Sequence, residues 1–204
     1  MRDETITAFL DQLAARVPAP GGGATAALHA AQSAALLAMV ARYSDGAKYD
    51  ARIMSHVIAE ADGIRNDALT LAEADAAAFA AVADAYKLPK QTEEQARERS
   101  AAIAKALGEA ARPPADVVRL ALLLVSLAEE LLPAGNRNVI TDVAAAAEAA
   151  RAAAVTAQIN IEVNLRGMKD PAVLVELAAM GEVTSEVTAR ADRVVAAVRE
   201  EIAR

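Results

Sequence analysis

Alanine, leucine, glutamate and arginine fill long stretches of the chain, and residues that disfavour helices are confined to a few short clusters of proline and glycine. This arrangement predicts helix almost throughout. Between the clusters we expect helices at roughly residues 5–17, 23–43, 49–86, 92–110, 114–132, 138–166 and 171–203. The pattern therefore predicts an all-α protein, an up-and-down bundle of about six to seven helices, several of them long, in a single domain over residues 1–204.

Two segments refine this prediction. Residues 23–43 are small or apolar on nearly every side, so this helix is expected at the middle of the bundle. Residues 158–165 instead alternate polar and apolar side chains and contain β-branched residues, which locally suggests a strand. No second strand is available to pair with it, and the helical run from Asp142 enters it without a break. We therefore predict helix.

Composition and charge exclude several functions. The chain has 28 acidic and 21 basic residues, a net charge of −7, and only five aromatic residues. A nucleic-acid partner is not expected, because it would require a basic surface and aromatic stacking platforms. The chain has no cysteine, so disulfides and thiolate chemistry are absent. Its two histidines, His29 and His56, are far apart in sequence, and no metal site is expected.

The apolar stretch 24–40 raises the question of a membrane span. It contains His29, Gln32 and Ser33 and runs directly into charged residues, and alanine is only weakly hydrophobic. A buried helix of a soluble protein is the better interpretation. The N-terminus lacks the apolar region and cleavage site of a signal peptide. We expect a cytoplasmic protein without a membrane partner.

The least ordinary local feature is the segment from Pro18 to Gly23, Pro-Ala-Pro-Gly-Gly-Gly, directly before a predicted helix. Glycines allow close approach, and free N–H groups at a helix N-terminus can bind a carboxylate or phosphate. Pro20, Gly21, Gly22 and Gly23 are thus candidate binding residues. The alternative is a tight interhelical turn in which only glycine fits. The segment is not a P-loop, because no Gly-Lys-Ser/Thr follows.

Several motifs, in order, resemble those of the formiminotetrahydrofolate cyclodeaminase and methenyltetrahydrofolate cyclohydrolase family. They are residues 9–14, residues 18–23, Lys48-Tyr49, Asp75 four residues before Phe79, residues 88–94 with Arg99, the run Gly135-Asn136-Arg137-Asn138-Val139-Ile140-Thr141-Asp142, and Asn160 and Asn164 followed by Gly167 and Asp170. Each motif alone is weak, but together they cover residues 5 to 170 with the spacing of the family.

The resemblance implies an all-helical homodimer that acts on a tetrahydrofolate derivative, with no tightly bound cofactor. Cyclodeaminases convert N5-formiminotetrahydrofolate to the 5,10-methenyl form and release ammonia, whereas stand-alone cyclohydrolases hydrolyse 5,10-methenyltetrahydrofolate to 10-formyltetrahydrofolate. In the bifunctional relatives a formiminotransferase domain comes first. No residues remain for that domain here, which favours the cyclohydrolase. A non-catalytic helical dimer that binds a folate or another anion is the alternative.

Both reactions need a group that removes a proton from water and protonates a leaving nitrogen. A buried carboxylic acid with a raised pKa can do both. Asp75 lies in an alanine-rich helix and, given the resemblance, is the first candidate for this general acid/base; the alternative is an exposed position. Asp142 is the second catalytic candidate, although a carboxylate is favoured in the first turn of any helix.

Polar side chains of the same motifs are candidate substrate ligands. Asn160 and Asn164 are four residues apart, share a helix face, and could bind the hydrogen-bonding edge of a pterin or form a polar seam against another subunit. Asn136, Asn138 and Thr141 belong to the asparagine motif, although both asparagines are also good helix caps. Lys48 and Tyr49 could meet the glutamate tail of a folate, with plain solvation of Lys48 as the alternative.

The chain departs from the family at several points. Asp45 stands where the family has a basic run before the tyrosine, which weakens attraction for a polyglutamate tail. Thr141 replaces a serine and keeps the hydroxyl, and Val155 replaces an arginine. These changes leave the predicted fold intact and leave open a diverged substrate.

Overall fold

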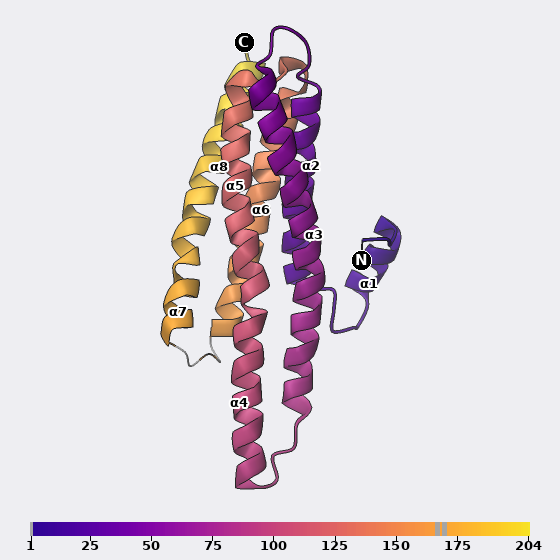
Figure 1. Ribbon diagram of the computed structural model, residues 1–204, viewed down its shortest axis with the longest axis vertical. Helices are drawn as coiled ribbons and strands as arrows, with labels where there is room; N and C mark the ends of the chain where they lie inside the picture. The colour runs from indigo at the N-terminus through magenta and orange to yellow at the C-terminus, as the bar shows by residue number, and fades with distance from the viewer. Residues whose placement is uncertain (1, 166–167, 169–170) are drawn as a thin grey trace.

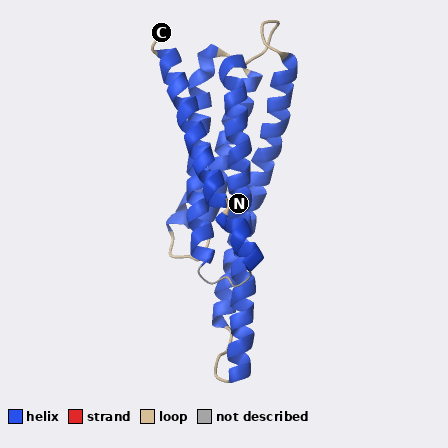
Figure 2. Cartoon of the chain, turned by 90° about the vertical axis from the view of Figure 1, so that its left-hand side faces the viewer, coloured by secondary structure: helices blue, strands red, loops and turns tan. Residues whose placement is uncertain are grey.

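The computed structural model describes residues 2–165, 168 and 171–204, and these form helices joined by short loops, with no strand among them (Figures 1 and 2). The elements are α1 (Ile6–Ala14), α2 (Gly22–Arg42), α3 (Ala51–Lys87), α4 (Glu93–Ala110), α5 (Arg112–Ala134), the 3₁₀ helix η1 (Arg137–Val139), α6 (Ile140–Leu165), α7 (Pro171–Ala178) and α8 (Met180–Ile202). The predicted all-α fold is confirmed. Residues 158–165 are helical, as predicted, at the end of α6.

Helix α2 packs against α3, α6 and α5. Its alanines, such as Ala26, Ala30 and Ala34, are fully buried, and small side chains let neighbouring helices approach closely. The hydroxyl of Ser33 donates a 2.8 Å hydrogen bond to the backbone oxygen of Ala146 in α6. By length and composition alone α2 could cross a membrane, but 61% of its most apolar stretch is buried among the other helices. The apolar side chains of α2 therefore form part of the protein core.

Helices α4 and α5 run in the same direction, almost as one helix (Figure 1). Only Ala111 separates them, and its backbone continues the helical bonding, because its N–H donates to Leu107 and its carbonyl accepts from Ala115. Pro113 and Pro114 lie in the first turn of α5, where a missing N–H costs little. Together with the 37-residue α3, α4 extends as an arm below the ends of α2 and α6 (Figure 1).

The C-terminal segment departs from the prediction of one helix over residues 171–203. The structure divides it at Ala179 into α7 and α8. The N–H of Glu182 bonds to the carbonyl of Ala179, three residues earlier, so the helix tightens locally at this point. The single-helix prediction is wrong at this residue.

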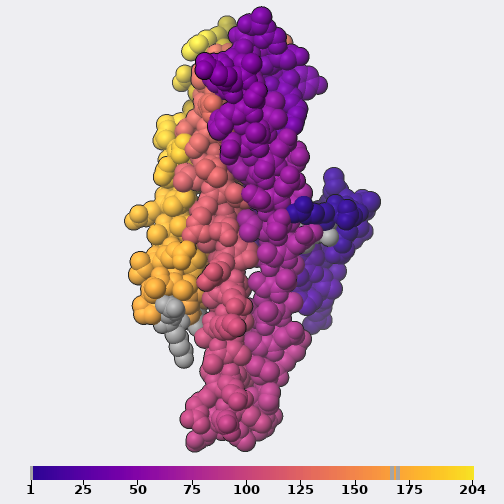
Figure 3. Space-filling view, in the orientation of Figure 1, coloured from indigo at the N-terminus to yellow at the C-terminus, as the bar shows by residue number. Residues whose placement is uncertain are grey.

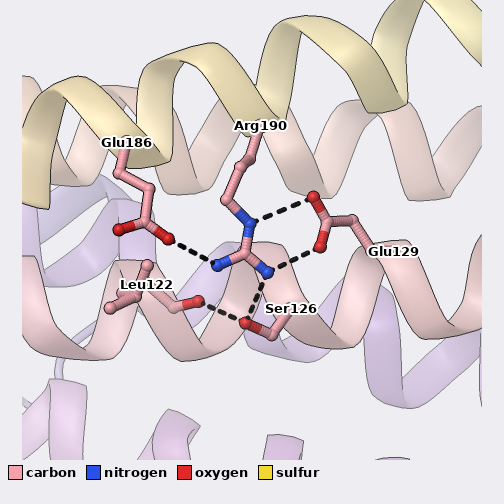
Figure 4. Close-up of polar contacts among 5 residues, drawn as sticks. All are labelled: Leu122, Ser126, Glu129, Glu186 and Arg190. Carbon is pink, nitrogen blue, oxygen red and sulfur yellow. Dashed lines mark hydrogen bonds and ion pairs between the residues drawn. The ribbon is translucent and has the colours of Figure 1, made fainter.

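A polar cluster joins α8 to α5 (Figure 4). The Arg190 guanidinium donates to both carboxylate oxygens of Glu129, over 3.0 and 2.6 Å. It also donates to the hydroxyl of Ser126 at 2.8 Å and to Glu186 at 3.1 Å. Arg190 holds the pKa of Glu129 below its usual range, chiefly through these hydrogen bonds. Every charge at this contact therefore has a partner.

Helix α1 stands beside the bundle and buries none of its residues (Figure 3). Its N-terminus is capped by the Thr5 hydroxyl, which accepts from the N–H of Ala8. Ile6 and Leu10 are 80% and 53% exposed. The segment after α1 leads into the Pro18–Gly23 turn, so α1 connects directly to the beginning of α2.

Candidate active site

Asp75 of α3 lies against the first turn of α2. A Cβ atom placed on Gly23 would overlap the Asp75 carboxylate, so only glycine leaves room for this approach. The backbone N–H of Ala24 donates a hydrogen bond to the carboxylate. The first turn of α2, directly after the Pro18–Gly23 segment, therefore lies against the Asp75 carboxylate, and one of its backbone N–H groups is bonded to that acid.

Burial raises the pKa of Asp75 above its usual range, and the Ala24 N–H bond offsets this only in part. No ion pair among the described residues reaches this carboxylate. Asp142, in contrast, is partly exposed in the first turn of α6. The surroundings of Asp75 therefore favour its protonated form.

Asn160 and Asn164 of α6 come to the same place. The Nδ2 atom of Asn160 lies 3.3 Å from where a Cβ on Gly22 would be, and it donates to the Thr156 carbonyl at 2.8 Å. The Asn164 amide donates to the carbonyl of Ala110, at the end of α4, over 3.3 Å. These bonds hold both amides in place, and each side chain keeps an oxygen that can accept a hydrogen bond from a ligand.

These groups line a cavity of about 480 Å³ between α2, α3, α4 and α6, a volume typical of small-molecule sites. Phe79 and Tyr86 of α3 form part of its wall and are 50% and 52% exposed. Arg99 of α4 lies 5.5 Å from the centre of the Tyr86 ring. The remaining lining is mostly apolar: Pro18, Ala19, Val82, Leu107, Ala110 and Val163. The cavity can hold a flat heterocycle against its aromatic wall.

Of the predicted binding residues, Gly21, Gly22, Gly23, Asn160 and Asn164 line this cavity with Asp75. Pro20 is buried beside it. Gly167 and Asp170, part of the late motif, lie outside the described residues.

The other predicted residues gather at the opposite end of the bundle, in the loop before α3 and around η1. Asn136 donates from its backbone N–H to the Ser44 hydroxyl at 2.8 Å and from its side chain to the Tyr43 carbonyl at 2.7 Å. Its side-chain oxygen accepts from the N–H of Asn138, so the predicted capping role is confirmed. Asn138, Thr141 and Asp142 follow on η1 and the first turn of α6.

Lys48 and Tyr49 belong to this same end. The Lys48 ammonium lies 4.7 Å from the centre of the Tyr49 ring, in the loop between α2 and α3. The 21 residues of α2 separate this end from the Gly23–Asp75 contact, which is a distance of about 30 Å. Within one chain, the sequence-predicted residues thus form two separate groups.

The aromatic wall of the cavity was not predicted from the sequence. Phe79, Val82 and Tyr86 follow Asp75 at intervals of four, seven and eleven residues, which places all four on one face of α3. In an alanine-rich helix, this spacing of large side chains from a candidate acid was the available signal.

The chain is similar in sequence to known proteins of one family. Residues 5–182 match the family described as formiminotransferase-cyclodeaminase. The methenyltetrahydrofolate cyclohydrolase of Methylorubrum extorquens is 38% identical over 173 residues, which span 83% of each chain. The rat formimidoyltransferase-cyclodeaminase is 33% identical over 171 residues, and these span 82% of this chain but only 32% of the rat protein.

One solved structure is closely similar over nearly its whole length. Formiminotetrahydrofolate cyclodeaminase from Thermotoga maritima superposes with a TM-score of 0.79 at 28% sequence identity. The match covers 98% of this chain and 96% of that one. The helical arrangement described above is therefore shared with a known cyclodeaminase structure.

Proposed function

The chain belongs to the formiminotransferase-cyclodeaminase family, whose members act on folate one-carbon units, and we propose that it hydrolyses 5,10-methenyltetrahydrofolate to 10-formyltetrahydrofolate. The observation that carries this proposal is the Asp75 carboxylate. It lies in a cavity with an aromatic wall, with a raised pKa and no cationic partner among the described residues. The similarity to a cyclohydrolase over 83% of both chains supports the hydrolytic direction.

In this proposal Asp75 is the catalytic residue and acts twice. As a carboxylate it accepts a proton from water while the water oxygen bonds to the methenyl carbon between N5 and N10. As a carboxylic acid it then returns that proton to N5 while the bond between N5 and the carbon breaks. The new hydroxyl loses its proton to solvent and becomes the formyl oxygen on N10. The sum is one water consumed and one proton released.

The raised pKa suits both steps, because an acid/base group works best when its pKa lies nearer the working pH. Proton transfer of this kind contributes about 10²–10⁴-fold to a rate, so positioning must supply much of the rest. Phe79 and Tyr86 would stack on the flat rings of the substrate. The side-chain oxygens of Asn160 and Asn164 would accept hydrogen bonds from the pterin N–H groups.

A cyclodeaminase is the second candidate, because the Thermotoga maritima structure and the rat relative carry that name. In that reaction N10 attacks the formimino carbon and ammonia leaves. The leaving nitrogen needs a proton, which Asp75 could supply from the same position. The two reactions therefore share the cavity and differ in the nucleophile.

The test is a continuous absorbance assay of 5,10-methenyltetrahydrofolate in mildly acidic buffer, where spontaneous hydrolysis is slow. We expect the wild-type protein to accelerate loss of the methenyl chromophore and Asp75→Asn to lower turnover by at least about 10²-fold. Glu73→Gln is the matched control, since Glu73 is an exposed acid two residues away on another face of α3.

Near-normal turnover in Asp75→Asn would remove Asp75 from the mechanism. If the wild-type protein leaves the methenyl compound unchanged but releases ammonia from N5-formiminotetrahydrofolate, the cyclodeaminase assignment replaces the cyclohydrolase. Binding of a folate without either reaction would favour the non-catalytic alternative.

A further inference from the structure

The aromatic wall of the cavity is long in one direction, along α3. Asp75 lies at one end of this wall and Tyr86 at the other, with Phe79 and Val82 between them on the same helix face. Tyr86 follows Asp75 by eleven residues, which corresponds to about 16 Å along the helix. The wall can therefore contact a molecule that extends well beyond the group on which Asp75 acts.

The proposed substrate is such a molecule, and its two ends carry opposite charges. The methenyl bridge between N5 and N10 is cationic, whereas the glutamate at the end of the tail carries two carboxylates. Ordinary bond lengths along the aminobenzoyl ring and the amide place these carboxylates roughly 10–14 Å from the methenyl carbon. With the methenyl carbon at Asp75, a substrate extended along the aromatic wall has its carboxylates near Tyr86.

The lining of the cavity offers these carboxylates no positive charge. Among the residues that the structure describes, Asp75 is the one charged residue in the lining. A cation does lie against the far end of the wall, because the Arg99 guanidinium of α4 is 5.5 Å from the centre of the Tyr86 ring. Helices α3 and α4 lie side by side at this end (Figure 1). The acid and the guanidinium thus occupy opposite ends of the wall, in the order that the charges of the substrate require.

Arg99 is held in place, but its charge is not paired. Helix α3 ends at Lys87, so carbonyl groups of its last turn lack helical N–H donors. The Nε and Nη2 atoms of Arg99 donate to one of these, the Tyr86 carbonyl, over 3.4 and 3.1 Å. No carboxylate among the described residues contacts Arg99. Its remaining N–H groups can therefore donate to both oxygens of a ligand carboxylate.

Other cations nearby do not combine these two properties. The Lys87 ammonium is already paired with the Asp84 carboxylate at 2.8 Å. Arg97 of α4 is exposed and lines a separate hollow with Ser100. Arg99 is half-buried, in contact with the cavity wall, and free to bind an anion.

We propose that Arg99 binds the glutamate carboxylates of the folate substrate and makes the enzyme prefer folates to the same pteridine without its glutamate. This role rests on the proposed function, because it takes the methenyl carbon to lie at Asp75. The sequence suggested Lys48 for contact with the tail, but within one chain Lys48 lies beyond the other end of α2. The alternative role of Arg99 is structural, as a cap on the last turn of α3.

The test compares 5,10-methenyltetrahydrofolate with 5,10-methenyltetrahydropteroate, which lacks the glutamate. We expect kcat/KM of the wild-type protein to be about tenfold lower for the pteroate compound, the effect of one charged hydrogen-bonded contact. Arg99→Gln should lower kcat/KM for the folate by about the same factor, mainly through KM, because the tail lies away from the reacting atoms. For the pteroate compound the same variant should change kcat/KM by no more than about twofold.

Two further variants sharpen this comparison. Arg99→Lys keeps the charge without the planar fork, so it should restore part of the preference for the folate. Arg97→Gln is the matched control, since it removes an exposed cation two residues away on another face of α4. We expect Arg97→Gln to leave kcat/KM unchanged for both substrates.

An equal loss with both substrates in Arg99→Gln would mean that Arg99 only supports the end of α3, and it would overturn the assignment. An unchanged preference for the folate in this variant would do the same. So would a preference that Lys48→Gln abolishes and Arg99→Gln leaves intact.

Failure of the proposed function has a different signature. If the wild-type protein hydrolyses neither methenyl compound, calorimetry with 5-formyltetrahydrofolate and 5-formyltetrahydropteroate makes the same comparison through dissociation constants. Weaker binding of the glutamate-bearing compound alone in Arg99→Gln would then support the tail site without hydrolysis. Equal affinity of the wild-type protein for both compounds, or no binding of either, would overturn the tail site.

Discussion

Asp75 and Arg190 are both ionisable side chains held between packed helices, but their surroundings differ. Arg190 contacts two carboxylates and a hydroxyl, and its guanidinium spans both oxygens of Glu129 (Figure 4). Asp75 receives one backbone hydrogen bond and lies beside a cavity, and burial raises its pKa. The surroundings of Arg190 stabilise its charge with opposite charges, whereas the surroundings of Asp75 disfavour its charged form.

This difference separates a structural role from a chemical one. A charge that is paired with opposite charges stabilises the fold, and its group has little tendency to exchange protons. An acid whose charged form is disfavoured has a raised pKa and keeps its proton to higher pH, which suits general acid/base catalysis. The α5–α8 contact therefore joins two helices, and the α2–α3 contact positions a reactive group.

The largest expected effect comes from moving Asp75 without changing it. In Gly23→Ala the new methyl group would overlap the Asp75 carboxylate and displace it from the first turn of α2. A displacement of about 1 Å can cost 10²-fold in rate, so we expect turnover of 5,10-methenyltetrahydrofolate to fall by about that factor or more. The absorbance assay measures this change.

Gly63→Ala is the matched control. Gly63 lies within α3 with open space around its α-carbon, so a methyl group fits. Replacing glycine by alanine inside a helix should raise stability by about 0.5–1 kcal/mol and leave turnover unchanged. Normal turnover in Gly23→Ala would show that close contact with α2 is not required for the chemistry of Asp75.

A smaller effect is expected at the paired site. Arg190→Lys keeps the charge but loses the bidentate hydrogen bonding to the Glu129 carboxylate. We therefore expect the free energy of unfolding to fall by about 1–2 kcal/mol. Urea denaturation measures this loss. Arg204→Lys, at the exposed C-terminus, should change stability very little.

The pH dependence of this loss has a definite sign. The folded-state pKa of Glu129 is lowered, so its contribution to stability is present above the ordinary glutamate value near 4.5 and disappears as the pH falls through the lowered value. The difference between wild type and Arg190→Lys should therefore narrow in acid. A difference that stays constant down to pH 3 would mean that packing, not the ion pair, holds α8.

Much of the fold followed from the sequence because proline and glycine mark where helices end. Thr92 and Gln95 form a capping box at the start of α4, and Pro113 and Pro114 lie in the first turn of α5. The interruption falls at Ala179, a strong helix former, and the nearby Gly181 lies inside α8 rather than at the break. That break depends on local tightening of the backbone, which composition does not reveal.

Half of the candidate site could be predicted and half could not, for a topological reason. Asp75, Gly23 and Asn160 meet because α2 begins and α6 ends on the same side of the bundle. The motif around Asn138 resembles a motif of the family, as the segment around Asp75 does. However, the end of the bundle at which Asn138 lies depends on how many times the chain reverses direction between the two residues. Because α4 and α5 run in one direction, Asn138 lies at the far end from Asp75.

The smallest predicted effect is an increase in stability on removing the catalytic acid. At neutral pH the folded protein holds the Asp75 carboxylate in surroundings that disfavour its charge. Asp75→Asn removes the charge and keeps an oxygen that can accept from the Ala24 N–H. We expect the melting temperature to rise by roughly 2–4 °C at pH 7, the shift that about 1 kcal/mol produces in a chain of this size.

The raised folded-state pKa also fixes how this gain depends on pH. Below the ordinary aspartate pKa, near 3.8, the carboxyl is neutral in both the folded and the unfolded chain, so wild type and variant should melt together. The gain grows as the pH rises through the raised pKa of Asp75 and then levels off. Calorimetric melting of both proteins from pH 4 to 8 measures the curve. A variant that is less stable than wild type at pH 7 would show that the Asp75 charge is stabilised in the fold, as that of Arg190 is, and the contrast between the two sites would be lost.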